Sequence, residues 1–249
     1  MPSLQISLDK VDYTFVNGES VKGVLTIEKY NNQPVTLDIE CIESVTSDSD
    51  ATTSFTTLFV QSIEIKNTSL KTNRFISAFQ FILPNGPPSF PIDKIFSKVE
   101  ITYFIHAKLI KKFSAGAKVK LIVKNPPCSI PKSLQEPFIH STKQITCYLN
   151  KLGYLWNDNI LFRCDPQLDP SITSTSVKFG YCANLYRTII KTTVSNNQAI
   201  LTIPTDLIAP FESKHMSFEY MVVIVIHYKG FFKRRSTICI PITVGCSYE

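Results

Sequence analysis

The longest regular alternation of apolar and polar residues runs over residues 99–109. The residues of one parity are all apolar: Val99, Ile101, Tyr103, Ile105, Ala107 and Leu109. The residues of the other parity are mainly polar. Side chains alternate between the two faces of a β-strand, so the pattern predicts a strand with one apolar and one solvated face. An apolar segment, residues 79–83, precedes it, and the Pro-rich connector 84–91 separates the two, because proline has no N–H to give to a sheet.

The same arrangement recurs about 120 residues later. Residues 199–204 form a second apolar segment that ends in proline, and residues 216–229 form a second long strand. Upstream, residues 13–27 and 153–162 each read as a strand, a polar turn and another strand. A repeat of this length indicates two copies of one domain rather than a solenoid, whose periods are shorter. The sequence therefore predicts an all-β chain of two tandem immunoglobulin-like antiparallel β-sandwich domains.

Prolines mark the expected boundary between the two domains. Pro126, Pro127 and Pro131 fall within six residues, and such a segment cannot form an interior strand. We therefore expect an N-terminal sandwich over residues 1–125, a Pro-rich linker over 126–134 and a C-terminal sandwich over 135–249. Within these domains, residues 46–57 are rich in Ser, Thr and Asp and predict a solvated loop, and residues 138–149 predict one strand.

Composition narrows the range of functions. The chain of 249 residues has only 8 glycines and no Gly-x-Ser-x-Gly or phosphate-cradling glycine loop, so we expect neither an enzyme nor a bound cofactor. Its 7 cysteines include no Cys-x-x-Cys pair, so reduced thiols are expected in place of a zinc site. The net charge of +6 is too small to predict nucleic-acid binding. Without an N-terminal apolar leader or a long apolar segment, a cytoplasmic protein is expected.

The positive charge is concentrated in two places, of which the first follows the long strand. Its lysines are Lys108, Lys111, Lys112, Lys118, Lys120 and Lys124. They are expected on the wet face of two strands and on the loop between those strands. One interpretation is an ordinary solvated face, and the other is a docking groove for acidic or phosphorylated peptides.

The second place is a loop near the end of the chain, in which Phe231 and Phe232 are followed by Lys233, Arg234 and Arg235. Adjacent aromatic residues with basic neighbours suit an anionic membrane surface. The alternative is that one ring folds back on the sandwich and the charges protect a sheet edge. Each buried ring would contribute at most ~3 kcal/mol and each cation about 1 kcal/mol. Because association costs at least ~4 kcal/mol, only weak membrane binding is expected.

Motifs along nearly the whole chain resemble the arrestin fold. They are Asn17-Gly18-Glu19-Ser20-Val21-Lys22-Gly23-Val24, Phe81-x-Leu83-Pro84 with Pro87-Pro88-Ser89-Phe90, Tyr103-x-x-x-Ala107-x-Leu109, Gly153-Tyr154, Ile203-Pro204 and Ile240-Pro241-Ile242. The resemblance is to the arrestin-domain-containing (α-arrestin) proteins and their relatives, including the arrestin-like subunit of retromer. It implies a cytosolic adaptor that binds cargo tails or subunits of a trafficking complex, peripherally on endosomal or plasma membranes. The alternative that it implies is a structural subunit of a retromer-like coat.

Departures from the family pattern limit what the resemblance implies. Arrestins that sense receptor phosphates carry a lysine pair in the first strand, whereas this chain has only Asp9-Lys10 there. Because it stands at the position of that pair, Lys10 is a further candidate, with the lysines named above, for binding acidic or phosphorylated peptides. A conformational switch triggered by receptor phosphates is not expected. Neither Pro87-Pro88 nor Pro126-Pro127 is followed by the tyrosine of a ligase-docking motif, and few residues follow residue 244.

Overall fold

The structure is a computed structural model. It describes residues 3–29, 34–46, 52–65, 73–90, 99–109, 116–126, 128–142, 145–166, 171–183, 185–205, 207–229, 235–245 and 247–248. These residues form an all-β protein with several antiparallel sheets, which confirms the all-β part of the expected fold class. Their only helical element is a short 3-10 helix, η1 (Lys132–Gln135). The chain divides into two compact units, residues 1–126 (unit 1) and residues 127–249 (unit 2).

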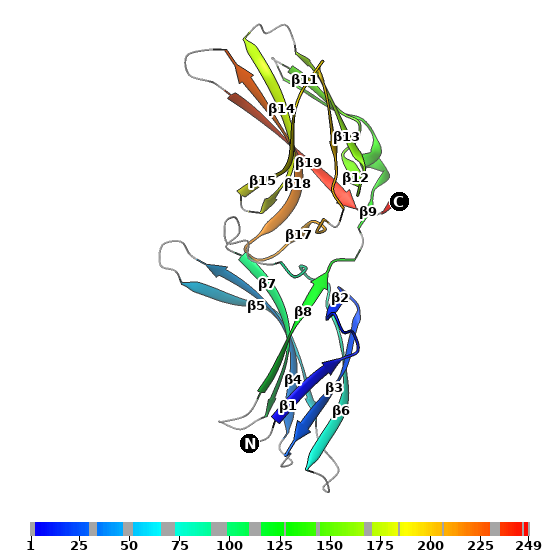
Figure 1. Cartoon of the computed structure of the whole chain (residues 1–249), viewed down its shortest axis with the longest axis vertical. Helices are drawn as coiled ribbons and strands as arrows, with labels where there is room; N and C mark the ends of the chain where they lie inside the picture. The colour runs from blue at the N-terminus through cyan, green and yellow to red at the C-terminus, as the bar shows by residue number, and fades with distance from the viewer. Residues whose placement is uncertain are drawn as a thin grey trace. The chain divides into compact units, whose positions relative to one another are not determined.

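Unit 1 contains two sheets. Its described strands are β1 (Ser3–Leu8), β2 (Thr14–Val16), β3 (Ser20–Glu28), β4 (Val35–Thr46), β5 (Thr53–Ile65), β6 (Arg74–Ile82), β7 (Val99–Leu109) and β8 (Gly116–Lys124). The smaller sheet has the order β1-β3-β6, and the larger has the order β2-β8-β7-β4-β5 (Figure 1). All neighbours are antiparallel except β2 and β8, which are parallel.

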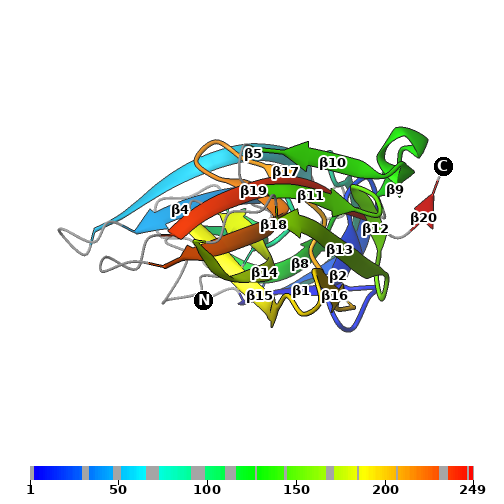
Figure 2. The same ribbon diagram turned by 90° about the horizontal axis from the view of Figure 1, so that it is seen from above.

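Unit 2 also contains two main sheets. Its described strands are β9 (Ser129–Ile130), β10 (Phe138–Ser141), β11 (Ile145–Leu149), β12 (Gly153–Leu155), β13 (Asn159–Pro166), β14 (Ile172–Ala183), β15 (Leu185–Thr193), β16 (Gln198–Thr202), β17 (Phe211–Glu212), β18 (Ser217–Tyr228), β19 (Arg235–Gly245) and β20 (Ser247–Tyr248). The sheets have the orders β10-β11-β13-β16 and β12-β19-β18-β14-β15. In Figure 2, β18 lies between β14 and β19. Strands β9 and β20 pair separately, in parallel.

The strand order of unit 1 is repeated in unit 2. The order β1-β3-β6 corresponds to β11-β13-β16, and β2-β8-β7-β4-β5 corresponds to β12-β19-β18-β14-β15. Even the exceptional parallel contact recurs, since β12 pairs in parallel with β19 as β2 does with β8. The strands that the sequence repeat aligned therefore occupy corresponding places in the two sheet systems.

The turn that enters the smaller sheet is also built in the same way twice. Gly18 between β2 and β3 has a φ of 82°, and Asn157 between β12 and β13 has a φ of 65°. Glycine and asparagine are the residues that adopt this left-handed conformation most readily. The Gly18 N–H donates to the Leu83 carbonyl and the Asn157 N–H to the Ile203 carbonyl, each at 3.0 Å. Each acceptor is the residue before the proline that ends the apolar segment.

A β-bulge recurs at the outer edge of each large sheet. In β5, Leu58 is the extra residue, because its neighbours Thr57 and Phe59 pair with consecutive residues of β4. In β15, Ile189 is the extra residue in the same way opposite β14. Neither bulge could be predicted from the alternation of apolar and polar residues, because a bulge shifts that alternation by only one residue.

The core of each unit lies between the apolar faces of its two sheets. In β7 the predicted inward residues are buried, and Tyr103 is fully enclosed. Its hydroxyl donates to the Pro87 carbonyl, and the buried Tyr220 of β18 donates to the Ile208 carbonyl at 2.8 Å. Burial raises the pKa of both phenols above the ordinary value. Each tyrosine thus ties a long central strand to the connector that precedes it.

The segment expected to be a linker contributes structure to unit 2. Residues 129–130 form β9, which pairs with β20, and η1 begins at Lys132. Ile130 is fully buried, and a Cβ placed at Gly153 would lie 2.1 Å from its Cγ2 atom. Prolines kept this segment out of the main sheets, as expected, but they did not prevent a two-residue strand.

Two strand assignments from the sequence differ from the structure. Within residues 46–57, where a solvated loop was expected, β5 already begins at Thr53. Polar Thr and Ser residues suit an exposed edge strand, so they gave no apolar alternation to detect. The single strand expected over residues 138–149 is a hairpin of β10 and β11, closed by Thr142, whose hydroxyl accepts from the Ile145 N–H at 3.1 Å.

Candidate binding surfaces

Three of the predicted lysines lie together on one surface of unit 1. Lys108 on β7 and Lys118 and Lys120 on β8 project from the side of the large sheet that faces away from the core. Lys111 and Lys112 lie outside the described residues. So do Phe231, Phe232, Lys233 and Arg234 of the proposed membrane loop. The one described residue of that group, Arg235, is exposed at the start of β19, opposite His227.

We define the charged face as eight of the outward side chains of β4, β7 and β8. Its residues are Asp38, Glu40, Glu100, Phe104, His106, Lys108, Lys118 and Lys120. Residues that lie opposite each other on β4, β7 and β8 form two rows across the sheet. One row runs Asp38, His106, Lys118, and the second runs Glu40, Phe104, Lys120. The charge therefore changes from acidic on β4 to basic on β8.

Each lysine of the charged face has a partner within it. The Lys108 Nζ lies 3.3 Å from the Asp38 carboxylate and 3.6 Å from that of Glu40. The Lys120 Nζ lies 3.1 Å from the Glu100 carboxylate. Lys118 lies over the ring of Phe104, with its Nζ 3.6 Å from the ring centroid. The surface is thus one of mixed charge rather than a purely basic one. The sequence did not reveal this balance, because two of the three acids come from β4, far away along the chain.

The centre of the charged face is a histidine enclosed by charges of both signs. Burial lowers the pKa of His106, Lys108 and Lys118 lower it further, and Glu40 and Asp38 oppose them. The imidazole is therefore neutral near pH 7. Asp38 is only 7% exposed, and its Oδ1 atom has no hydrogen-bond partner among the described residues.

The corresponding side of the unit 2 sheet is apolar along the middle of β18 and β19, although it also carries Lys178 on β14. On β18, whose place in the sheet matches that of β7, the outward residues include Met221, Val223 and Val225. On β19, which matches β8, they include Cys239 and Pro241. The two units share one strand order, so the fold itself does not require the charges of unit 1.

Lys10 lies elsewhere, in the segment between β1 and β2, where it contacts Glu19 in the turn between β2 and β3. Its Nζ is 2.6 Å from a carboxylate oxygen of Glu19 and 4.9 Å from the centroid of the Phe15 ring. The other oxygen of Glu19 accepts from the Val16 N–H at 2.9 Å. The hydrogen bond from Lys10 lowers the pKa of Glu19, and the bond from Val16 lowers it further.

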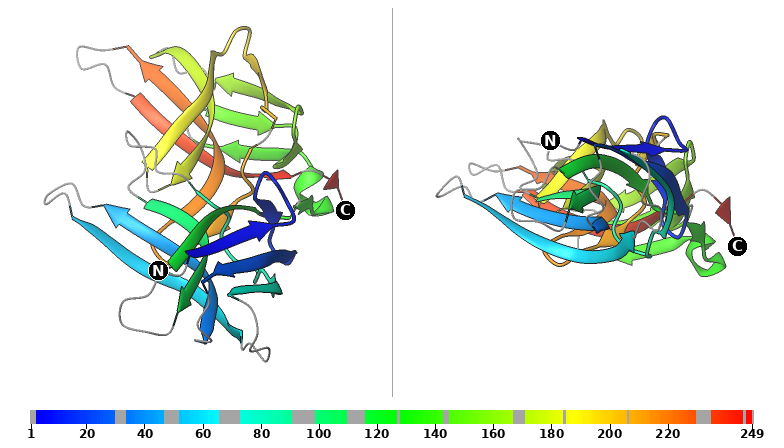
Figure 3. Two further views of the ribbon diagram at one scale, coloured as in Figure 1. Left: turned by 60° about the horizontal axis from the view of Figure 1, so that its bottom comes forward. Right: turned by 90° about the horizontal axis from the view of Figure 1, so that it is seen from below.

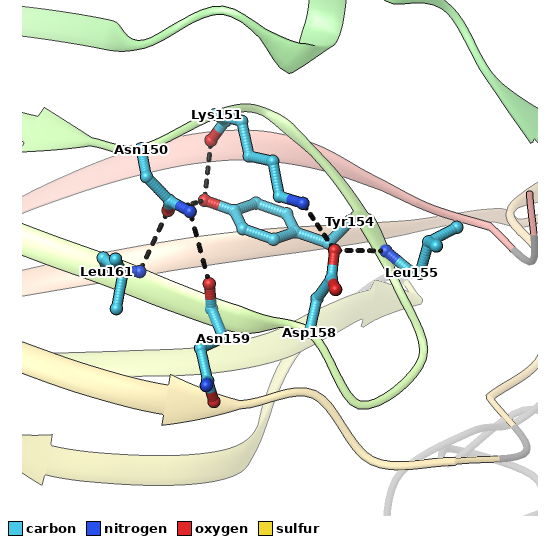
Figure 4. Close-up of polar contacts among 7 residues, drawn as sticks. All are labelled: Asn150, Lys151, Tyr154, Leu155, Asp158, Asn159 and Leu161. Carbon is cyan, nitrogen blue, oxygen red and sulfur yellow. Dashed lines mark hydrogen bonds and ion pairs between the residues drawn. The ribbon is translucent and has the colours of Figure 1, made fainter. Parts of the chain in front are cut away.

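Unit 2 repeats this cluster with different residues (Figure 4). Lys151 pairs with Asp158 and lies over the ring of Tyr154, with its Nζ 5.2 Å from the ring centroid. Asp158 accepts from the Leu155 N–H at 3.0 Å, three residues earlier, as Glu19 does from Val16. The Tyr154 hydroxyl donates to Asn150 at 3.0 Å. The match to Lys151 identifies Lys10 as a residue that holds a turn, and the structure does not place it on the charged face.

The described residues offer little for other classes of site. No group of three or more His, Cys, Asp or Glu side chains among them is arranged to hold a metal ion. No helix in the described part of the chain has the length and apolarity needed to cross a membrane. Comparison with known proteins adds no identification: no protein-family model and no curated protein matches the chain.

Proposed function

We propose that the chain is an arrestin-like adaptor of the cytosol, built from two tandem arrestin-like β-sandwiches, which binds protein partners through the charged face. The observation that carries the proposal is the strand order shared by the two units, together with ion pairs that the described residues form on the outward side of the large sheet in unit 1 and not in unit 2. Because the same strand order forms in unit 2 without these ion pairs, they are not needed for folding, and we attribute them to binding. The partners are cargo tails or subunits of a trafficking complex, met on endosomal or plasma membranes.

The chemistry of the charged face suits recognition rather than strong adhesion. Three carboxylates and three amines lie in ordered rows, so a partner with the complementary pattern would gain contacts while a partner with the wrong pattern would meet like charges. The more exposed ion pairs, such as that of Lys120 with Glu100, contribute little to folding. They can therefore be exchanged for intermolecular pairs at small cost. A role of this kind requires neither a cofactor nor a reaction.

Charge reversal on β8 tests the proposal. We expect Lys118→Glu with Lys120→Glu to weaken partner capture roughly tenfold, since reversing two exposed charges costs about 1–2 kcal/mol in binding. The measurement is affinity purification of the tagged chain from its native cells, with quantitative mass spectrometry of the proteins recovered. Raising the salt concentration should weaken the wild-type complexes in the same way, because salt screens exposed charges.

The matched control lies on the corresponding sheet of unit 2. Lys178 on β14 and Lys191 on β15 are cross-strand partners, and reversing both changes the net charge equally. If both variants recover a partner protein at equally reduced levels, that partner responds to net charge alone. Such a result would contradict the proposal. Recovery of one subunit in stoichiometric amount would instead indicate the coat-subunit alternative.

A further inference from the structure

The longest open sheet edge among the described residues is β5, the last strand of the large sheet in unit 1. Its 13 residues pair with β4 on one side, and no described strand pairs with the other side. It holds a single charged residue, Glu64, and neither lysine, arginine nor proline. Proteins normally protect such edges with charged residues, prolines, β-bulges or short strands, because unpaired backbone groups template pairing with another chain. Of these devices β5 has only the bulge at Leu58 and the one charge of Glu64. Figure 3 shows β5 in light blue along the margin of this sheet.

The corresponding edge in unit 2 is protected. β15 occupies the same place in its sheet and carries the same bulge, but it includes Arg187 and Lys191 within 9 residues. The remaining edges of the smaller sheets are shorter: β1 has 6 residues, β6 has 9 and starts at Arg74, β10 has 4 and β16 has 5. The fold thus accommodates basic residues on the edge strand at this position, and β5 of unit 1 has none.

The side chains of β5 also favour pairing. Phe55 is 72% exposed and Val60 is 56% exposed, and both belong to the outward side of the strand. Aromatic and β-branched residues opposite each other across two strands are among the more stabilising cross-strand pairs. The edge strand has no cation and only one carboxylate, so it has no charges with which to recognise a charged peptide.

We propose that two copies of this chain associate by antiparallel pairing of their β5 strands. The arrangement is isologous, so each copy supplies the same surface and the contact closes on two chains. Pairing about the middle of β5 places the two Glu64 side chains roughly 30 Å apart at ~3.3 Å per residue, beyond the screening length of ~8 Å. A strand whose single charge lies near one end is therefore complementary to itself in the antiparallel direction. This inference is independent of the adaptor proposal and of the charged face.

A lysine placed on β5 tests the pairing. We expect the average mass of the wild-type chain in sedimentation equilibrium to rise from 28.1 kDa toward twice that value over a hundredfold range of concentration. Val60→Lys should weaken the association at least about tenfold, because the two introduced lysines would lie diagonally across the centre of the new ladder. Phe55→Lys should weaken it as well, because it removes an exposed aromatic ring from the paired strands. Both side chains point into solvent, so the urea midpoint of each variant should stay close to that of the wild type.

The matched control is Ile200→Lys on β16, an edge residue that is 63% exposed in unit 2. It removes the same kind of exposed apolar side chain and adds the same charge, and it should leave the association unchanged. A wild-type chain that stays at 28.1 kDa throughout would overturn the proposal. So would a dimer that persists in Val60→Lys and Phe55→Lys, or one that Ile200→Lys weakens equally.

Discussion

Glu19 illustrates how a single ionised residue contributes to the fold. Lys10 and the Val16 N–H hold its pKa below the ordinary value of 4.5. A carboxyl whose pKa is lowered by folding stabilises the folded state above the pKa it has when unfolded. That contribution is lost as the pH falls through the lower, folded-state pKa.

We therefore expect Glu19→Gln to lower the urea midpoint at pH 7 and to have almost no effect near pH 3. The loss at pH 7 should stay below about 1 kcal/mol, because the pair is partly exposed and screened by solvent. Urea unfolding of both proteins at several pH values measures the difference. Lys10→Met should remove the larger share of this pH dependence, because the Val16 N–H still holds the carboxylate. A difference that does not vary with pH would contradict the assignment.

The cysteines predict a clear order of chemical reactivity. Burial raises the pKa of Cys41 and of Cys147 to about 12, and it also raises that of Cys164. The thiolate is the reactive form, so these thiols should resist alkylation at pH 8. Cys239 is exposed and should react first. Mass-spectrometric mapping after timed iodoacetamide treatment measures the order, and unfolding in urea should make all of them react. Rapid labelling of Cys41 in the folded protein would show that the core is open.

Residue types alone indicated part of the candidate surface. The lysines of β7 and β8 could be identified because the strand pattern assigned them to one wet face. Their partners Asp38 and Glu40 could not, because pairing between strands distant in sequence is decided by the fold. Lys10 was misleading for a related reason: its partner Glu19 is 9 residues away, across a turn whose geometry no periodicity reveals.

Among the elements, the bulge between β14 and β15 depends on Gly180. A Cβ placed there would lie 1.8 Å from the Arg187 carbonyl oxygen, so any side chain would force the two strands apart. We expect Gly180→Ala to destabilise unit 2 by at least about 1–3 kcal/mol, the usual range for overpacking. Urea unfolding followed by circular dichroism measures the loss.

Gly116 at the start of β8 provides the comparison. A Cβ there would lie 3.3 Å from the Ala107 carbonyl oxygen, a contact that a small shift can relieve. Gly116→Ala should therefore cost much less than Gly180→Ala. Equal losses would mean that the bulge tolerates a side chain and that Gly180 has no special role.

The strands themselves were predictable wherever one face was apolar and the other wet. The clearest case is β7, whose predicted inward residues are all buried and whose other residues, except Thr102, are more exposed. The prediction failed at β5, because its residues 53–57 are polar or exposed and carry no burial signal. It also failed at β10 and β11, where a tight hairpin leaves both strands similar in composition. The alternation of apolar and polar residues reflects burial of one face, so it does not detect strands whose side chains are mostly exposed.

At the level of the whole chain, the boundary between the units has a measurable consequence. Unit 2 begins at residue 127, and the buried Ile130 belongs to it. We expect a fragment of residues 127–249 to fold and a fragment of residues 135–249 to be less stable by about 2–5 kcal/mol, the loss for a buried large side chain. Thermal melting of the two fragments measures the difference.

Ile130→Ala in the longer fragment separates packing from chain length. It should lower the melting temperature in the same direction, because the space beside Gly153 and Gly245 would then be empty. If the fragments starting at residues 127 and 135 melt at the same temperature, the segment before η1 does not belong to the folded unit.

The parallel contact between β9 and β20 has one more consequence. Ser129 is the partner of Ser247, so the segments that open and close unit 2 run side by side, about 4.8 Å apart. A module whose entrance and exit adjoin in this way can be inserted into a surface loop of an unrelated host without stretching that host. Its ends can equally be joined and the chain reopened at the exposed Asn196-Asn197 turn, which gives a circularly permuted form.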